Sequence, residues 1–195
     1  MRTAAVIAAA GLSSRMGEFK PLMELGGKPM LLHVVDAFLN AGVDTVVVVC
    51  GYRAGEIREV LAGRNVHITD NPAYKTTDML ASLRLGLQTL EGQFDRVFLN
   101  PADVPLLDPS LLQRMMEGSA PLMQTSYQGK GGHPVLMHRS LLSELLAYRG
   151  EDGLRGFLQQ HREILTFLEA PDEGALLDAD TPEEFQRLTN FLKSY

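Results

Sequence analysis

The sequence predicts an α/β fold in which helices cover both faces of a mostly parallel central sheet. Short apolar runs alternate with amphipathic segments along the chain, which indicates repeated strand–helix–strand units. Residues 45–50 form an unbroken β-branched run that ends in a cysteine, typical of a strand buried on both faces of a parallel sheet. No linker or low-complexity stretch interrupts the 195 residues, so we expect one domain spanning residues 1–195.

Apolar spacing and boundary signals predict the individual elements in order. Strands are predicted over the apolar runs 3–9, 45–50, 66–68, 96–100, 122–126, 134–137 and 164–168. Helices are predicted over the amphipathic segments 29–41, 54–61, 79–90, a segment starting at 109, 139–147, 153–161 and 182–192. Pro29 and Gly42 bound the first helix, and Thr181 with Glu184 has the spacing of a capping box at the last.

Charge limits the class of ligand. The chain has 18 Lys and Arg against 24 Asp and Glu, a net charge of −6, which argues against a nucleic-acid-binding protein. Residues 1–30 hold four cations and two anions, so the remaining 165 residues carry a net charge of −8. A locally basic start in an acidic chain favours a small anionic ligand, such as a chelated nucleotide, over a polymer.

The single cysteine and the apolar runs indicate the cellular compartment of the protein. Cys50 cannot form an intramolecular disulfide, and it is expected in the core, as in proteins of a reducing compartment. The apolar run after Met1 stops at Gly11, too early for a membrane span, and reads as a buried strand. We therefore expect a cytoplasmic protein that does not enter a membrane.

The loop over residues 10–20 is the first candidate for chemistry. It follows a predicted strand and contains Gly11, Gly17 and two serines, so its backbone N–H groups can turn toward a phosphate. Arg15 and Lys20 would add positive charge. The loop matches neither a Walker A motif nor GxGxxG, and the alternative is a solvated turn with two surface cations.

Carboxylates supply the second candidate. Asp103 lies between two prolines after an apolar strand, where it can hold a divalent ion against a phosphate or simply form a turn. Asp178 and Asp180 precede the last helix, where they can share a cation or stabilise the helix start. His133, between glycines and a proline, has close access for a ligand, or else is a surface histidine.

Other reaction classes find no support in the sequence. The remaining histidines have no spacing typical of zinc ligands, and there is no Gly-x-Ser-x-Gly elbow of a hydrolase. The apolar positions of segment 79–90 are expected in the core, whereas Ser82 near its start can face a ligand.

Taken together, these motifs resemble the nucleotidyltransferases that build the dinucleotide forms of the molybdenum cofactor, the MobA- and MocA-like NTP transferases. Residues 9–22, AAGLSSRMGEFKPL, are similar to the signature loop AAGxSxRMGxxK of that family. Weaker blocks follow in the family's order: Asn71-Pro72 with segment 79–87, Asp103-Val104-Pro105, Gly132-His133-Pro134 and Asp180-Thr181-Pro182. The resemblance runs from the first strand to Glu184.

The resemblance implies a Rossmann-like three-layer α/β/α fold and a Mg²⁺-dependent transfer of a nucleoside monophosphate to a phosphorylated acceptor, with release of pyrophosphate. Catalysis would rest on Arg15, Lys20 and Asp103, with Asp103 and Asp180 holding Mg²⁺ and His133 near the acceptor. The nucleotide would contact residues of the loop and of two later segments, namely Ala9, Ala10, Gly11, Leu12, Ser13, Arg15, Gly17, Lys20, Ser82, Pro101 and Ala102.

The resemblance also bears on the substrates. The cytidylyl branch has Ala-Ala-Gly in the loop, and the guanylyl branch has Ala-Gly-Gly with an Asp before the lysine. Ala10 and Phe19 at these places resemble the cytidylyl branch, which implies CTP, molybdopterin or a related acceptor, and a molybdoenzyme partner. Asp78 stands where the family has Gly, and Pro101-Ala102 replace Leu-Gly. A carboxylate at 78 would repel phosphate, or contact a metal or a ribose.

Two other interpretations remain. The acceptor can be a sugar phosphate, an alditol phosphate or a phosphonate. In a different class, the chain can be a non-catalytic carrier or insertion chaperone for a pterin cofactor, although such a protein would not need the carboxylates at 103 and 180.

Overall fold

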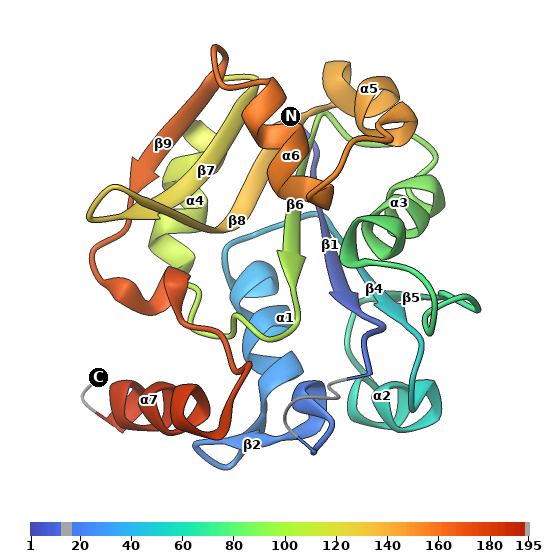
Figure 1. The fold of residues 1–195 in the computed structure, drawn as a ribbon, viewed down its shortest axis with the longest axis vertical. Helices are drawn as coiled ribbons and strands as arrows, with labels where there is room; N and C mark the ends of the chain where they lie inside the picture. Colours follow the sequence, from blue (N-terminus) through green and yellow to red (C-terminus); the bar gives the residue numbers. More distant parts are fainter. Residues whose placement is uncertain (13–16, 194–195) are drawn as a thin grey trace.

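A seven-stranded sheet forms the centre of the computed structural model, which describes residues 1–12 and 17–193 (Figure 1). Its strand order is β5-β4-β1-β6-β8-β7-β9. Among the described strands of this sheet only β8 runs antiparallel to its neighbours, so the predicted mostly parallel sheet is confirmed. The strands are β1 (Thr3–Ala9), β4 (Thr45–Cys50), β5 (His67–Asp70), β6 (Arg96–Pro101), β7 (Leu122–Tyr127), β8 (Lys130–His138) and β9 (Leu165–Glu169).

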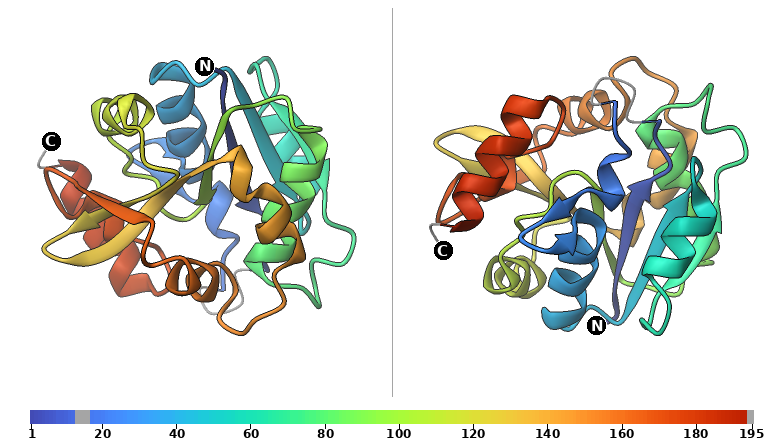
Figure 2. Two further views of the ribbon diagram at one scale, coloured as in Figure 1. Left: turned by 90° about the horizontal axis from the view of Figure 1, so that it is seen from above. Right: turned by 90° about the horizontal axis from the view of Figure 1, so that it is seen from below.

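Helices cover both faces of the sheet, as predicted (Figure 2). One face packs against α1 (Met30–Asn40), α2 (Ala54–Val60) and α4 (Pro109–Glu117). The other packs against α3 (Met79–Thr89), α5 (Leu142–Ala147) and α6 (Gly153–Gln160). Short 3-10 turns, η1 (Lys20–Leu22), η2 (Arg139–Leu141) and η3 (Glu173–Leu176), complete the connections. The expected three-layer α/β/α arrangement is therefore present.

Strand β1 shows why the core has two halves. Its side chains alternate, so that Ile7 contributes to the core under α1 whereas Val6 contributes to the core under α3. Helix α3 lies close to the sheet at Gly86, where an added Cβ would come within 2.3 Å of Val6 Cγ1. Glycine at this position therefore sets the depth of α3, and with it the position of the helix start beside the strand ends.

A smaller core joins the two ends of the chain. The hairpin β2 (Glu24–Leu25) and β3 (Lys28–Pro29) lies beside α7 (Pro182–Lys193) at the end of the molecule toward which β1 and β6 point (Figure 1). Leu25, Met30 and Leu188 are fully buried between them. This contact holds the segment before α7 close to the carboxyl ends of the strands.

The structure shifts several predicted boundaries by one or more residues, and two of these shifts have a clear local cause. Pro29 pairs with Glu24 in the hairpin, so the first helix begins at Met30, one residue later than expected. Residues 130–133, expected in a loop, belong to β8, because a tight turn with positive φ at Gln128 and Gly129 reverses the chain earlier. In the part of the chain that the structure describes, no helix has both the length and the apolar character needed to cross a membrane.

Candidate active site

The carboxyl ends of β1 and β6 form the floor of a pocket with a volume of about 210 Å³, which we call the β1–β6 pocket. The two strands are paired with Ala8 opposite Pro101, and the Ala102 N–H donates to Ala8 O at 3.0 Å. Small side chains at these strand ends leave the backbone exposed to a ligand, as is usual for ligand sites in parallel sheets. The lining residues are Ala8, Ala9, Ala10, Gly11, Lys20, Pro21, Tyr74, Thr77, Asp78, Met79, Ser82, Pro101, Ala102 and Asp103.

Hydrogen bonds from the Asn100 side chain fix the loop that carries Asp103. This side chain is fully buried, and its Nδ2 donates to Pro101 O at 2.7 Å and to Val104 O at 3.5 Å. Both bonds close the turn around Asp103. The loop therefore presents a carboxylate on a fixed backbone at the end of β6.

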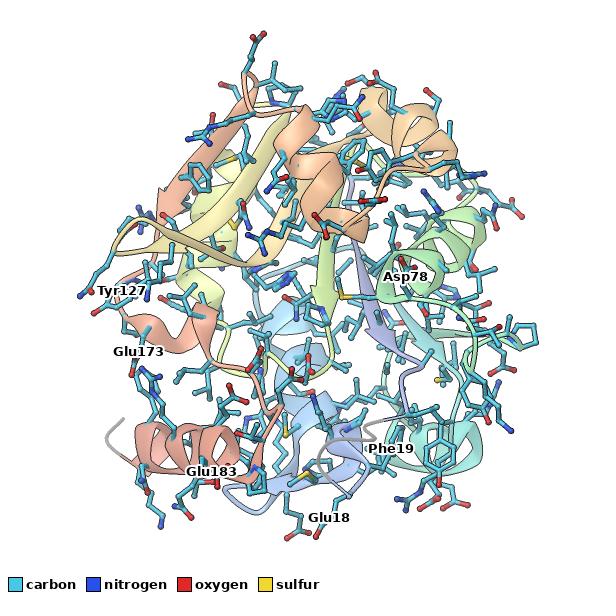
Figure 3. All side chains as sticks on the ribbon, in the orientation of Figure 1. Glu18, Phe19, Asp78, Tyr127, Glu173 and Glu183 are labelled. Atoms are coloured by element: carbon cyan, nitrogen blue, oxygen red, sulfur yellow. The ribbon has the colours of Figure 1, made fainter. Side chains whose placement is uncertain are left out.

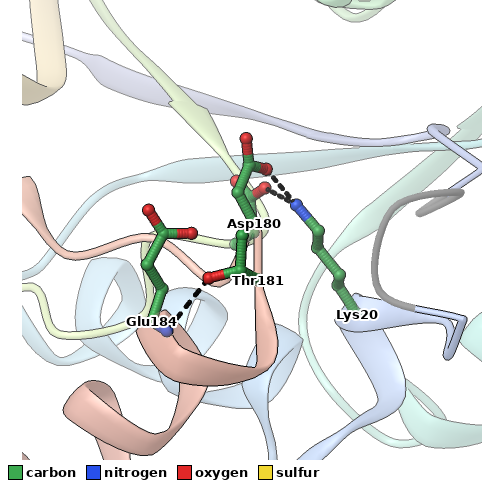
Figure 4. A network of polar contacts seen from close by, with 5 residues as sticks. Lys20, Asp180, Thr181 and Glu184 are labelled. Carbon is green, nitrogen blue, oxygen red and sulfur yellow. Dashed lines mark hydrogen bonds and ion pairs between the residues drawn. The ribbon is translucent and has the colours of Figure 1, made fainter.

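Lys20 is the centre of the polar contacts in the pocket (Figure 4). Its side chain is only 10% exposed, and Nζ donates to Asp103 Oδ2 at 3.0 Å and to Asp180 Oδ1. The three residues come from η1, from the loop after β6 and from the segment before α7. One ammonium group therefore joins the two carboxylates that the sequence predicts as metal ligands.

The carboxylates determine the charge state of this centre. Burial alone would lower the pKa of Lys20, but the hydrogen bonds and charges of Asp180 and Asp103 outweigh it and raise that pKa above its usual value of 10.5. Nearby Asp178 has a raised pKa, mainly because it is desolvated and also because Asp180, Asp103 and Glu184 repel its charge. Lys20 is therefore charged at neutral pH, in surroundings already crowded with carboxylates.

The start of α3 and the loop before it form the second wall. Asn71 is buried and its Nδ2 donates to Thr77 Oγ1 at 2.9 Å and to Ser82 Oγ at 3.0 Å, which fixes this wall. Asp78 lies at the start of α3, next to β1 (Figure 3), and its Oδ1 accepts from the Ala81 N–H at 2.8 Å. The unexpected carboxylate at 78 is therefore the N-cap of α3 as well as part of the pocket wall.

Most of the predicted nucleotide-binding residues come together in this pocket. Ala9, Ala10, Gly11, Lys20, Ser82, Pro101 and Ala102 all line it, together with the predicted metal ligand Asp103. Leu12 and Gly17 instead border a neighbouring hollow together with Phe19 and Tyr52. Ser13 and Arg15 lie outside the described residues.

His133 lies away from the β1–β6 pocket, in a larger groove of about 890 Å³ that we call the α6 groove. Its Nδ1 is buried without a hydrogen-bond partner among the described residues. Burial lowers the pKa of His133, although the charge of Asp103 and the backbone of Leu99 act in the opposite direction. The imidazole is therefore neutral at neutral pH.

The α6 groove meets the β1–β6 pocket, since Asp78 and Met79 line both. Its walls come from α6, β9 and the β7–β8 turn, and they include Gln124, Leu158, Gln159, Leu165 and Phe167 with two arginines, Arg155 and Arg162. Sequence reasoning missed these residues. The signal that was available is the spacing of 155, 158, 159 and 162, which places charged, apolar and amide groups on one helix face.

The pair Asp103 and Asp180 fits a magnesium ion. Both carboxylates reach a single cationic nitrogen, so they are spaced to share one small cation. No group of three or more potential His, Cys, Asp or Glu ligands occurs among residues 1–12 and 17–193. A site with two protein carboxylates is what Mg²⁺ uses when substrate phosphates and water supply the other ligands.

Comparison with known proteins identifies the family. The model of the MobA-like NTP transferase domain matches residues 5–164, most of the chain. The chain belongs to this family. The resemblance seen in the signature loop is thereby confirmed, and the chain is a nucleotidyltransferase by family. Asp180 and α7 lie beyond the matched residues.

Individual relatives of this MobA-like chain differ in how much of it they match. It is 26% identical to the molybdenum cofactor cytidylyltransferase of Escherichia coli K12, over 92% of both chains. It is 38% identical over 120 residues, 57% of the chain, to a CMP-5'-(3-aminopropyl)phosphonate synthase of Streptomyces rubellomurinus. The chain covers only 18% of that synthase and 25% of a bifunctional GlmU protein of Sorangium cellulosum.

The fold of the MobA-like chain is shared by solved structures. Rv0371c of Mycobacterium tuberculosis H37Rv superposes with a TM-score of 0.87 and 24% identity, over 97% of this chain and 98% of that one. The same mycobacterial protein has also been solved in complex with manganese, with a TM-score of 0.80 and 22% identity, over 97% of this chain and 99% of that one. These likenesses confirm the expected Rossmann-like fold.

Proposed function

We propose that this MobA-like protein transfers CMP from CTP to molybdopterin or a related phosphorylated acceptor and releases pyrophosphate. The observation that carries the proposal is the contact of Lys20 with both Asp103 and Asp180 in the pocket at the ends of β1 and β6. The choice of CTP is supported by the cytidylyl-type loop and by two relatives whose names specify a cytidylyl product or activity.

In the proposed reaction, an acceptor phosphate oxygen attacks the α-phosphorus of CTP, and the bond to the leaving pyrophosphate breaks. No protein nucleophile takes part, so the chain acts by positioning and by neutralising charge. Lys20, held charged by two carboxylates, contacts the phosphates of CTP. Arg15 would add a planar guanidinium suited to phosphate oxygens.

Magnesium is the proposed cofactor, held by Asp103 and Asp180 together with phosphate oxygens. When bound, the ion supplies positive charge that offsets the negative charge developing on the phosphates. The manganese complex of the mycobacterial neighbour supports a divalent ion on this fold. Lys20 already occupies the space between the two carboxylates, so we expect its Nζ to shift toward the phosphates when the ion binds.

We propose that the acceptor binds in the α6 groove, which contains His133 and opens beside Asp78 and Met79. Molybdopterin is the first choice, because the Escherichia coli cytidylyltransferase matches 92% of the chain. A phosphonate or another small phosphorylated acceptor is the second choice, because the Streptomyces synthase is more identical over the matched part. A molybdoenzyme that receives the product is the proposed partner for the first choice.

A substrate panel tests the proposal. Pyrophosphate release is measured with CTP or GTP, combined with molybdopterin, 3-aminopropylphosphonate and glucose 1-phosphate, each with Mg²⁺ and with EDTA. We expect release only with Mg²⁺, faster with CTP than with GTP, and fastest with molybdopterin. If GTP gives the faster reaction, the base assignment is wrong. If the protein binds a pterin tightly yet no combination releases pyrophosphate, the chain is a carrier instead.

A further inference from the structure

We propose that Arg162 selects acceptors that carry a second anionic group, distant from the phosphate that reacts, while Arg155 serves the reacting phosphate itself. This inference rests on the proposed function, because it assumes that the α6 groove receives the acceptor. It names the class of acceptor as an elongated molecule with two anionic ends.

Both arginines are placed to bind a ligand rather than to stabilise the fold. They line the α6 groove, and neither side chain has an ion pair or hydrogen bond within the described part of the chain. Other arginines are used structurally: Arg64 pairs with Asp36, and Arg96 donates to the carbonyl oxygens at the end of α4. A guanidinium facing a groove without a partner is suited to phosphate or carboxylate oxygens.

The direction of α6 separates the two roles. The helix begins at the meeting point with the β1–β6 pocket, because a Cβ on Gly153 would lie 3.4 Å from Asp78 Oδ2. Arg155 is two residues further on, and Arg162 follows seven residues later, just beyond the end of the helix. At a rise of about 1.5 Å per residue, the two guanidinium groups start from backbone positions about 10 Å apart along the groove.

The charges of the groove support the same division. Its two carboxylates, Asp78 and Asp152, both lie at the end where α6 begins. Arg155 is the cation next to them, so it offsets their charge and lets a phosphate approach. Arg162 has no such carboxylate among the described groove residues, which leaves its full charge to attract a second anion.

The opposite wall of the α6 groove offers an apolar surface to the part of the acceptor that lies between its two anionic ends. Phe167 on β9 is 51% exposed and lines the groove together with Leu165. A large exposed aromatic side chain inside a groove is a surface on which a ring or carbon chain can lie. The groove therefore suits a molecule whose anionic ends are separated by such a body.

A matched pair of probes tests the inference without knowledge of the natural acceptor. Binding of fructose 1,6-bisphosphate and of fructose 6-phosphate is measured by titration calorimetry with wild type, Arg155→Gln, Arg162→Gln and Arg139→Gln. Arg139 is the control, because it lies at the opposite end of β8 from the groove. Circular dichroism checks that each variant is folded.

We expect wild type to bind the bisphosphate at least about tenfold more tightly than the monophosphate, the effect of one charge-assisted pair. Arg162→Gln removes this preference, Arg155→Gln weakens both probes by about tenfold, and Arg139→Gln changes neither. The inference is overturned if wild type shows no preference or binds neither probe, if the preference survives Arg162→Gln, or if Arg139→Gln abolishes it equally.

Titration of the same samples with CTP and Mg²⁺ separates the two proposals. Failure of wild type to bind CTP counts against the proposed function, even where the groove discriminates between the probes. Tight CTP binding with no discrimination counts against the role of Arg162 alone.

Discussion

The β1–β6 pocket and the α6 groove meet at Asp78 and Met79, yet they differ in what lines them. The pocket is lined largely by small side chains and backbone at strand ends, with one buried ion-pair centre at Lys20. The groove is lined by long side chains of α6 and β9, including two arginines whose side chains have no partner among the described residues. We propose that the first surface binds a constant ligand, the phosphates of a nucleotide, and that the second binds a variable one.

Under this proposal, the difference between the two surfaces would explain how one fold serves several acceptors. The relatives of the chain include a molybdenum cofactor cytidylyltransferase and a phosphonate synthase, whose names share the cytidylyl group and differ in the acceptor. A pocket built on backbone changes little when side chains change, whereas a groove built on long side chains changes with each substitution. We expect substitutions in the two regions to affect different kinetic constants.

Substitution of Lys20 tests the pocket and should have the largest effect. We predict that Lys20→Ala lowers kcat with every acceptor by about 10²–10³-fold, because a preorganised positive charge is lost from the phosphates. Lys193→Ala, on the exposed end of α7, is the control and should retain full activity. Both are assayed by pyrophosphate release below their own melting temperatures. Loss of activity with only one acceptor would contradict the division into two regions.

Substitution of Phe167 tests whether the α6 groove binds the acceptor. We predict that Phe167→Ser raises KM for the acceptor by about tenfold, the effect of roughly 1–2 kcal/mol of lost apolar contact, and leaves KM for CTP unchanged. Ile164→Ser is the matched control, since Ile164 is also an exposed apolar residue but does not line the groove. Steady-state kinetics with each substrate varied in turn makes the measurement. An equal rise in both KM values would show that the regions are not separate.

Asp78 lies on the boundary, and two substitutions separate its roles. We predict that Asp78→Ala lowers the free energy of unfolding by about 1 kcal/mol, because the N-cap of α3 is lost, whereas Asp78→Asn retains the cap. Both variants remove a negative charge next to the phosphates and should bind CTP more tightly. Denaturant unfolding and CTP titration measure the two effects. Equal stability of the two variants would rule out the capping role.

Substitution of Asp178 tests whether the repulsion between the carboxylates around Lys20 destabilises the fold, and it should have the smallest effect. Its raised folded pKa means that the ionised side chain destabilises the native state above the unfolded value of 3.8. We predict that Asp178→Asn raises Tm slightly at neutral pH, which corresponds to a gain of less than about 1 kcal/mol in the free energy of unfolding. This gain disappears as the pH falls below 3.8. Glu183→Gln, an exposed neighbour on α7, should give no such gain.

Local signals were sufficient to predict the sheet and most of the pocket from the sequence. The valine run of β4 and the residues that follow β1 and β6 reveal strand ends, and parallel strand ends meet at one edge. Lys20 and Asp103 were therefore predicted at one edge of the sheet, and the family resemblance added Ser82. The structure brings the three residues into one pocket.

Features that depend on packing between distant segments were not predictable in the same way. The hairpin at 24–29 is stable because α7 covers it, and α7 is more than 150 residues away in the chain. The approach of Asp180 to Lys20 follows from that contact, so the sequence offered only the carboxylate and not its partner. The groove likewise depends on α6 facing β9, which the helical spacing of Arg155 and Arg162 does not reveal.

The central claim is that Lys20, Asp103 and Asp180 form one centre that binds a nucleotide together with a divalent ion. Titration of CTP into wild type and Asp103→Asn, each with Mg²⁺ and with EDTA, tests it most directly. We predict that Mg²⁺ tightens CTP binding to wild type by at least about tenfold and has no effect on Asp103→Asn, because that substitution removes one of the two proposed ligands. Binding of CTP that is equally tight with and without Mg²⁺ in wild type would contradict the account.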